Sequence, residues 1–175
     1  MGECGRGKFR EQTDEKTGRS GTGLLSILFS PLVHRYTVTD IPELIPLIKK
    51  NISTNVTSTS ASNIVVQDLD WTTLQSTPLA LRQKAFSFED IDILLMVDCV
   101  YHPSLVSPLI EAMRYLTTPG KTTVVVVVEL RAEDVVREFL EAWLQSDPGW
   151  QIWSVGEQKL DSMYALWVGR LGKKG

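Results

Sequence analysis

The chain has 175 residues, 43% of them apolar and 22% charged, which suits one globular domain with a substantial core. A formal net charge of -3 provides no basic field, so direct binding to a nucleic acid backbone is disfavoured. The only cysteines, Cys4 and Cys99, are too few for a disulfide scaffold, and no apolar run reaches the roughly 18 residues of a membrane span, so we expect a protein of the reducing cytosol or nucleus.

The amino-terminal part combines a polar segment with a glycine turn. Residues 1–17 are rich in glycine and charge and poor in apolar residues, which predicts a disordered segment before a folded domain of residues 18–175. The turn Ser20-Gly21-Thr22-Gly23 follows, and the crowded apolar residues of 24–32 predict a buried helix that stops near Pro31. Such a turn lets the backbone approach a ligand and offers N–H groups to an anion, although an ordinary glycine-rich loop has the same composition.

The next unit reads as a strand, an acid and a helix. Residues 35–39 are β-rich and end at Asp40, and residues 41–52 have helical apolar spacing. The distance along the chain from Gly23 to Asp40 is close to the roughly 20 residues at which an acid binds ribose hydroxyls in dinucleotide folds. Asp40 is alternatively a helix N-cap.

A polar loop over residues 53–63 leads to a strand at 64–67 and then to the tetrad Asp68-Leu69-Asp70-Trp71. The indole of Trp71 is suited to stack on an adenine, and Asp68 or Asp70 to accept a hydrogen bond from its exocyclic amine. A packed core tryptophan is the alternative interpretation of Trp71.

Residues 91–97 are apolar apart from Asp92, as expected of a central parallel strand covered on both faces. The loop Asp98-Cys99-Val100-Tyr101 follows, and residues 104–116 predict an amphipathic helix. A carboxylate and a phenol at the end of a strand are suited to orient an amine nucleophile, so Asp98 and Tyr101 are candidate catalytic residues. Tyr101 is otherwise a packing residue.

The carboxyl-terminal third continues the alternation. Residues 122–129, with five consecutive valines, predict a strand, residues 132–144 a helix, and residues 150–155 and 163–171 an antiparallel pair at one sheet edge. The whole pattern predicts an α/β fold with a mostly parallel sheet, whose carboxyl edge presents the candidate site residues. His34 and His102 are too few and too far apart for a metal cluster, so we assign no metal.

Taken together, Asp68-Leu69-Asp70-Trp71 and Asp98-Cys99-Val100-Tyr101 resemble the seven-strand protein-lysine methyltransferases that use S-adenosylmethionine. The resemblance extends from about Gly18 to the end. Residues 94–116 and the segment Val128-Glu129-Leu130-Arg131-Ala132-Glu133-Asp134 are most similar to the fungal ribosomal lysine N-methyltransferase 5 branch. The resemblance implies a Rossmann-like fold, an antiparallel carboxyl-terminal edge, and a substrate lysine in a large-subunit ribosomal protein. It also implies that Gly21 and Gly23 hold the methionine end of the cofactor, Asp40 the ribose and Trp71 the adenine, that the backbone of Val97 lies beside the cofactor, and that Asp98 and Tyr101 face the substrate.

One departure from the family pattern affects the fold. The family has an apolar strand ending in an acid and a glycine before the turn, whereas this chain has Asp14-Glu15-Lys16-Thr17-Gly18-Arg19. We therefore expect a shortened form in which the first strand is missing or degenerate and its neighbours lack a partner. Two alternatives stay open: a non-catalytic binding module with the same fold, and a nicotinamide-dependent oxidoreductase, which the glycine offsets disfavour because they do not match G-x-G-x-x-G.

Overall fold

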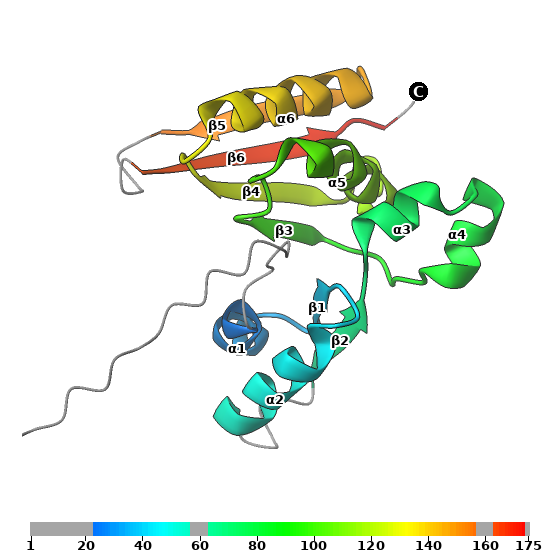
Figure 1. The fold of residues 1–175 in the computed structure, drawn as a ribbon, viewed down its shortest axis with the longest axis vertical. Coiled ribbons are helices and arrows are strands. Elements are labelled where there is room, and N and C mark those ends of the chain that lie inside the picture. The colour runs from blue at the N-terminus through cyan, green and yellow to red at the C-terminus, as the bar shows by residue number, and fades with distance from the viewer. Residues whose placement is uncertain (1–22, 57–62, 157–162, 174–175) are drawn as a thin grey trace, which may run out of the picture.

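The computed structural model describes residues 23–56, 63–156 and 163–173. The segment 1–17, for which we predicted disorder, lies outside these residues. So does Gly21, for which we predicted contact with the cofactor. Within the described residues the strands form two separate sheets, one of two strands and one of four, with helices packed on them (Figure 1). No helix in this part of the chain is both long and apolar enough to cross a membrane.

The first sheet belongs to an amino-terminal α/β unit. Its strands pair in parallel from Tyr36 with Ile64 to Asp40 with Asp68. Ile48 and Ile52 of the second helix pack on this small sheet through Val38. In chain order the unit consists of α1 (Leu24–Phe29), the short 3-10 helix η1 (Ser30–Leu32), β1 (Tyr36–Asp40), α2 (Ile45–Asn55) and β2 (Ile64–Asp68).

The second sheet has the strand order β3-β4-β6-β5. β3 and β4 are parallel, whereas β6 runs antiparallel to both β4 and β5, so the predicted antiparallel carboxyl-terminal edge is confirmed. The described strands thus make two parallel and two antiparallel pairings, and the four-stranded sheet is mixed, with its antiparallel part at the predicted carboxyl-terminal edge. Its elements are α3 (Trp71–Ser76), α4 (Leu79–Ala85), β3 (Ile93–Val97), α5 (Pro103–Leu116), β4 (Thr123–Glu129), α6 (Glu133–Ser146), β5 (Trp150–Val155) and β6 (Tyr164–Leu171).

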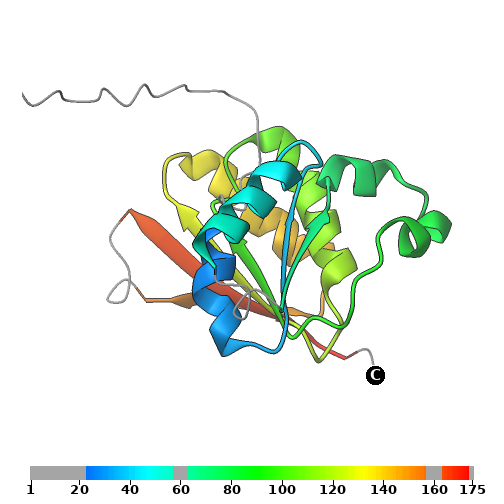
Figure 2. The same ribbon diagram turned by 90° about the horizontal axis from the view of Figure 1, so that it is seen from below.

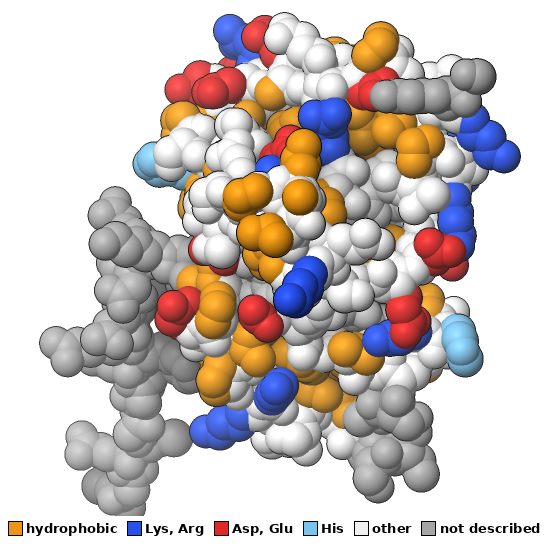
Figure 3. Space-filling model, turned by 90° about the vertical axis from the view of Figure 1, so that its right-hand side faces the viewer, with side chains coloured by type: hydrophobic (Ala, Val, Ile, Leu, Met, Phe, Trp, Pro, Cys, Tyr) orange, Lys and Arg blue, Asp and Glu red, His pale blue; other side chains and the backbone are white. Residues whose placement is uncertain are grey.

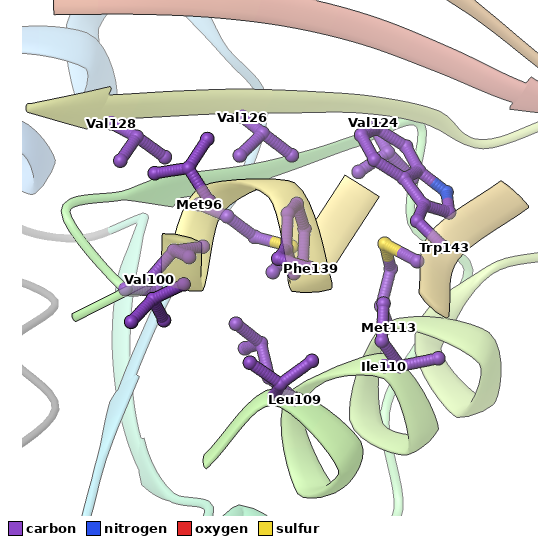
Figure 4. Packing of buried hydrophobic residues seen from close by; sticks show 14 of the residues in the cluster. Met96, Val100, Leu109, Ile110, Met113, Val124, Val126, Val128, Phe139 and Trp143 are labelled. Carbon is purple, nitrogen blue, oxygen red and sulfur yellow. The ribbon is translucent and has the colours of Figure 1, made fainter. Parts of the chain in front are cut away.

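The main core lies between one face of the four-stranded sheet and the helices α5 and α6. Alternate valines of β4 point toward Met113 of α5 and Phe139 of α6 (Figure 4). Trp143 is fully buried beside them and meets Trp150 edge-on at 5.5 Å between ring centroids. Every second residue of β4 and one face of α6 are buried in the same apolar cluster. The sequence therefore shows a period of two residues in β4 and of 3.6 residues in α6, from which both elements could be predicted.

The outer edge of β3 is less covered than we predicted. β3 pairs with β4 alone among the described strands, and Ile93 is 63% exposed, so the strand expected to be central lies at a sheet edge. Figures 1 and 2 show α1, β1, β2 and α2 as a group beside β3 and not joined to it by a strand. Among the described residues, β1 and β3 each pair on one side only. Residues 14–19, where we expected the first strand to be missing or degenerate, lie outside the described residues.

The helix predicted at residues 24–32 forms, but the prediction that it is buried is wrong. Leu24 and Leu28 are more than half exposed, and Leu32 is more exposed still. Only Ser26 and Ser30 are buried, because α1 and η1 pack on one side alone, through Ile27, against the α2 and β1 cluster. An apolar helix needs cover on more than one side to be buried, and the described residues provide cover on one.

Candidate functional site

Asp40 ends β1 with its side chain only 6% exposed. Its Oδ1 accepts a hydrogen bond of 2.9 Å from the backbone N–H of Ile41, and its carbonyl accepts one of 2.8 Å from the N–H of Leu69. The second bond ties the carboxyl ends of β1 and β2 together. A buried carboxylate at this edge of a parallel pair is where an α/β sheet binds its ligands.

The tetrad after β2 divides into a helix cap and a ring. Asp70 is the N-cap of α3: its carboxylate accepts from the N–H and hydroxyl of Thr72 at 2.9 and 2.7 Å and from the hydroxyl of Thr73 at 2.7 Å. Burial raises the pKa of Asp70, but the hydrogen bonds from Thr73 and Thr72 outweigh it and leave the pKa below its ordinary value. These bonds occupy the carboxylate that we considered for adenine recognition, whereas Asp68 is exposed.

Trp71 begins α3 and contacts both the main core and a smaller apolar cluster formed by Leu69, Leu74, Phe86 and Ala112. It also lines a hollow of about 50 Å³ together with Asp40, Leu69 of the β2 loop and Leu105 of α5. The structure therefore brings Asp40, predicted to bind the ribose, and Trp71, predicted to bind the adenine, to one place. The volume of this hollow is far below the roughly 300–1,000 Å³ of complete ligand sites.

Asp98 follows β3 with a φ of 53°, a left-handed conformation that few residues other than glycine and asparagine or aspartate adopt. Its N–H still donates to the carbonyl of Val127 at 2.8 Å, so the turn begins directly at the end of the ladder. The carboxylate is 46% exposed, and its Oδ2 lies 3.1 Å from Nη2 of Arg131, which also pairs with Glu129. The structure thus presents Asp98 at the carboxyl edge with a cation beside it.

Cys99 connects the two halves of the site electrostatically. Burial and, to a lesser extent, the carboxylates of Asp98 and Asp40 raise the pKa of the thiol to about 12. Both acids therefore make the charged thiolate less favourable. The thiol donates weakly to the carbonyl of Val97 at 3.5 Å and remains neutral at physiological pH, which removes it as a nucleophile.

We expect Cys99 to react with iodoacetamide at pH 8 more than about 1,000-fold more slowly than a free cysteine, because few thiols are ionised at a pKa of about 12. Mass spectrometry of the peptide that contains Cys99, sampled over time, measures this rate. Labelling in concentrated guanidinium chloride is the positive control. Rapid labelling of the folded chain would show that the thiol is accessible and ionised.

The remaining predicted site residues, Val97, Tyr101 and Gly23, do not line the hollow formed by Asp40 and Trp71. Val97 ends β3 opposite Val127, half-buried, and Tyr101 is exposed just before α5, where His102 caps the helix through Nδ1. Gly23 has a φ of 85° and faces Ile48 and Ile52 of α2, and it does not line the hollow of Asp40 and Trp71. A side chain at Gly23 would be strained by this φ whatever space surrounds it.

Sequence reasoning missed two members of the site, Glu129 and Arg131. They stand at the end of β4, the neighbour of β3, and the charged residues directly behind the valine run were the available signal. A larger cavity, about 340 Å³, is elsewhere, between α4 and the end of α5, where Phe86 and Tyr115 line it. Figure 3 views the side on which α3 and α4 lie, where apolar and charged side chains are mixed. Nothing in the sequence pattern connects that cavity with the site.

A family model described as lysine methyltransferase matches residues 18–146. The chain belongs to this family. Among curated proteins, it is 30% identical over 141 residues to EEF1A lysine methyltransferase 3 of Xenopus tropicalis, covering 77% of this chain and 58% of that protein. It is 25% identical over 150 residues to ribosomal lysine N-methyltransferase 5 of Eremothecium gossypii, covering 71% and 46%. It is also 32% identical over 126 residues to a protein of Schizosaccharomyces pombe named diaminohydroxyphosphoribosylamino-pyrimidine deaminase, covering 71% of this chain and 28% of that protein.

This lysine methyltransferase family member thus spans between 28% and 58% of the length of these relatives. Solved structures show the same fold at low identity. An rRNA methylase of Streptococcus thermophilus superposes with a TM-score of 0.57 and 11% identity, covering 89% of this chain and 84% of that one. A Streptococcus mutans protein described as a methyltransferase, in complex with SAH, has a TM-score of 0.55 and 14% identity, covering 90% of each. The fold is therefore that of S-adenosylmethionine-dependent methyltransferases.

Proposed function

We propose that the chain is an S-adenosylmethionine-dependent protein-lysine N-methyltransferase. The observation that carries the proposal is the Asp98 carboxylate, which a left-handed turn presents at the carboxyl end of β3, with Asp40 and Trp71 lining one hollow after β1 and β2. In this proposal Asp98 binds the substrate amine and Asp40 binds the ribose of the cofactor. The family assignment also leaves the nicotinamide-dependent alternative without support.

The residues at the carboxyl edge fit the nucleoside part of S-adenosylmethionine. Asp40 has a buried carboxylate suited to ribose hydroxyls, and Trp71 offers its ring in the same hollow. The backbone of Val97 would lie beside the cofactor, and Gly23, with Gly21, would hold its methionine end. When bound, the cofactor supplies a methyl group on a positively charged sulfur.

The residues of this chain act on the lysine. Asp98 and Tyr101 hold the amine in line with the methyl carbon, and alignment of this kind supplies most of the rate in a bimolecular displacement. The amine reacts through its lone pair and so must be neutral, which the buried, apolar Val100 and the neutral thiol of Cys99 favour by limiting water at the end of β3.

The substrate that we propose is a large-subunit ribosomal protein in the cytosol or nucleus. The support is the 25% identity to ribosomal lysine N-methyltransferase 5 and the resemblance of residues 94–116 to that branch. The similarity to EEF1A lysine methyltransferase 3 makes elongation factor 1A the substrate to compare. The net charge of -3 argues against direct contact with RNA as the basis of recognition.

Incubation of the purified chain with methyl-labelled S-adenosylmethionine tests this function on purified large ribosomal subunits and on purified elongation factor 1A. We expect label on a lysine of a large-subunit protein. Label on elongation factor 1A alone would contradict the proposal of a ribosomal substrate but would support the proposed lysine methyltransferase activity. A folded, monodisperse chain that neither transfers methyl nor binds S-adenosylmethionine would instead be the non-catalytic binding module.

Replacing Asp40 with asparagine should weaken S-adenosylmethionine binding by about 10-fold or more, because hydrogen bonds to a charged group contribute roughly 1.5–3 kcal/mol each. Titration calorimetry measures the Kd of both forms. The matched control is Glu43→Gln, which changes an exposed acid of the same connection between β1 and α2. Equal affinity of Asp40→Asn and wild type would remove the ribose role.

A further inference from the structure

Three charged side chains meet at the carboxyl ends of β3 and β4, where the proposed substrate lysine reaches Asp98. Arg131, in the connection between β4 and α6, places Nη2 at 3.1 Å from Oδ2 of Asp98 and also pairs with Glu129. A guanidinium thus stands beside the carboxylate to which the substrate ammonium would bind. The chain carries its own cation at the lysine site.

The two contacts of Arg131 differ in strength. The side chains of Asp98 and Arg131 are 46% and 64% exposed, and pairs exposed to this degree are screened by water and weak. Glu129 is only 23% exposed and lies opposite Tyr164 in the ladder between β4 and β6. Glu129 therefore holds the guanidinium more firmly than Asp98 does, so Asp98 is the partner that can be shared.

We propose that Arg131 is a positioning residue of the lysine site: it stays on Glu129 and shares the Asp98 carboxylate with the incoming amine. This inference rests on the proposed function. A carboxylate already shared with a guanidinium attracts an ammonium less strongly than an unshared one does. The bound amine therefore loses its proton to water at a lower pH, after which its lone pair forms the bond to the methyl carbon as the carbon–sulfur bond breaks.

The neighbouring groups leave Arg131 as a fixed charge over the whole assay range. The hydrogen bond with Glu129 and, next, the charge of Asp98 raise the pKa of Arg131 above its already high ordinary value. Tyr164 of β6 adds to this effect, and the Cys99 thiol, with a pKa of about 12, remains neutral. Any change of the pH profile on removing Arg131 thus reports the amine and not the arginine itself.

Replacing Arg131 with glutamine should lower kcat and KM together, each about threefold at pH 7, and move the pH profile of kcat upward by about half a unit. The reason is that the ammonium form binds more tightly and reacts less often. The ratio kcat/KM should stay nearly constant, because the neutral amine binds free enzyme equally well in both forms. Arg131→Lys keeps the positive charge and should retain the wild-type profile.

The experiment measures methyl transfer by the full chain, with S-adenosylmethionine, to purified large ribosomal subunits or elongation factor 1A, whichever is the substrate, between pH 6 and 9. Arg137→Gln is the matched control, since Arg137 on α6 is similarly exposed at 67% and also pairs with a glutamate. An Arg131→Gln profile identical to that of Arg137→Gln, or a loss of kcat/KM without a pH shift, overturns the proposal. A wild-type chain without transfer to either substrate overturns the proposed function and this inference with it.

Discussion

Replacing Asp98 with asparagine should reduce kcat/KM for methyl transfer by about 100-fold or more, because a preorganised group that holds the reacting atoms contributes on the order of 10²–10³ in rate. Asparagine suits the test better than alanine, since it tolerates the φ of 53° at this position and keeps the size of the side chain. The affinity for S-adenosylmethionine should not change, because the acid proposed for the ribose is Asp40. Initial rates with methyl-labelled cofactor, and calorimetry for its binding, measure the two quantities.

The other end of the same strand provides the control for this variant. Asp92 precedes β3, its side chain is 83% exposed, and its nearest cation, Lys121, is 3.9 Å away. Asp92→Asn therefore removes the same charge from the opposite edge of the sheet and should leave turnover as it is. If Asp98→Asn retained the turnover of Asp92→Asn, Asp98 would not hold the amine.

Replacing Gly169 with alanine should lower the free energy of unfolding by about 3 kcal/mol, since overpacking of a close-packed core typically costs 1–3 kcal/mol and occasionally more. A Cβ at Gly169 of β6 would lie 2.3 Å from Cζ2 of Trp143, which is fully buried beside Phe139 and Trp150. Because Trp143 is fully buried, its ring can make room only by displacing its neighbours. Urea unfolding followed by circular dichroism measures the change, and the midpoint of thermal unfolding should fall by about 6–12 °C.

Two further variants separate this steric cause from a general effect of losing glycine. Gly156 follows β5 with nothing within 4 Å of an added Cβ, so Gly156→Ala should have little effect. Trp143→Phe removes the part of the ring that the new methyl group meets, so the double variant with Gly169→Ala should be more stable than the sum of the two single changes predicts. Additive losses would show that Trp143 is not the obstacle.

The strongly periodic elements were readable from the sequence because one local pattern determines each of them. Five valines in a row predict β4, and the spacing of Val135, Val136 and Phe139 predicts α6. The short link between two β-rich segments likewise predicted the antiparallel pairing of β5 with β6. The acids Asp40 and Asp98 were predicted at strand ends and are found there, since a strand's boundary is a local property.

Short helices and burial were less predictable. α3 and α4 have 6 and 7 residues, too few to show a period, and α3 begins because Asp70 caps it. The exposure of α1 and of Ile93 depends on what packs against them and not on their own apolar character. A sequence window reports which residues favour burial, whereas a neighbouring element decides whether they obtain it.

The sequence by itself determined that this is an α/β protein of the methyltransferase type, with an antiparallel carboxyl-terminal edge and acids behind its strands. Only the tertiary structure decided that Asp40 and Trp71 line the same hollow. It also decided that Asp98 forms an ion pair with Arg131, 33 residues further along the chain. The physical reason is that strand adjacency is set by hydrogen bonding between distant segments. Two charges at the ends of β3 and β4 meet because these strands pair in parallel, and no local pattern encodes that pairing.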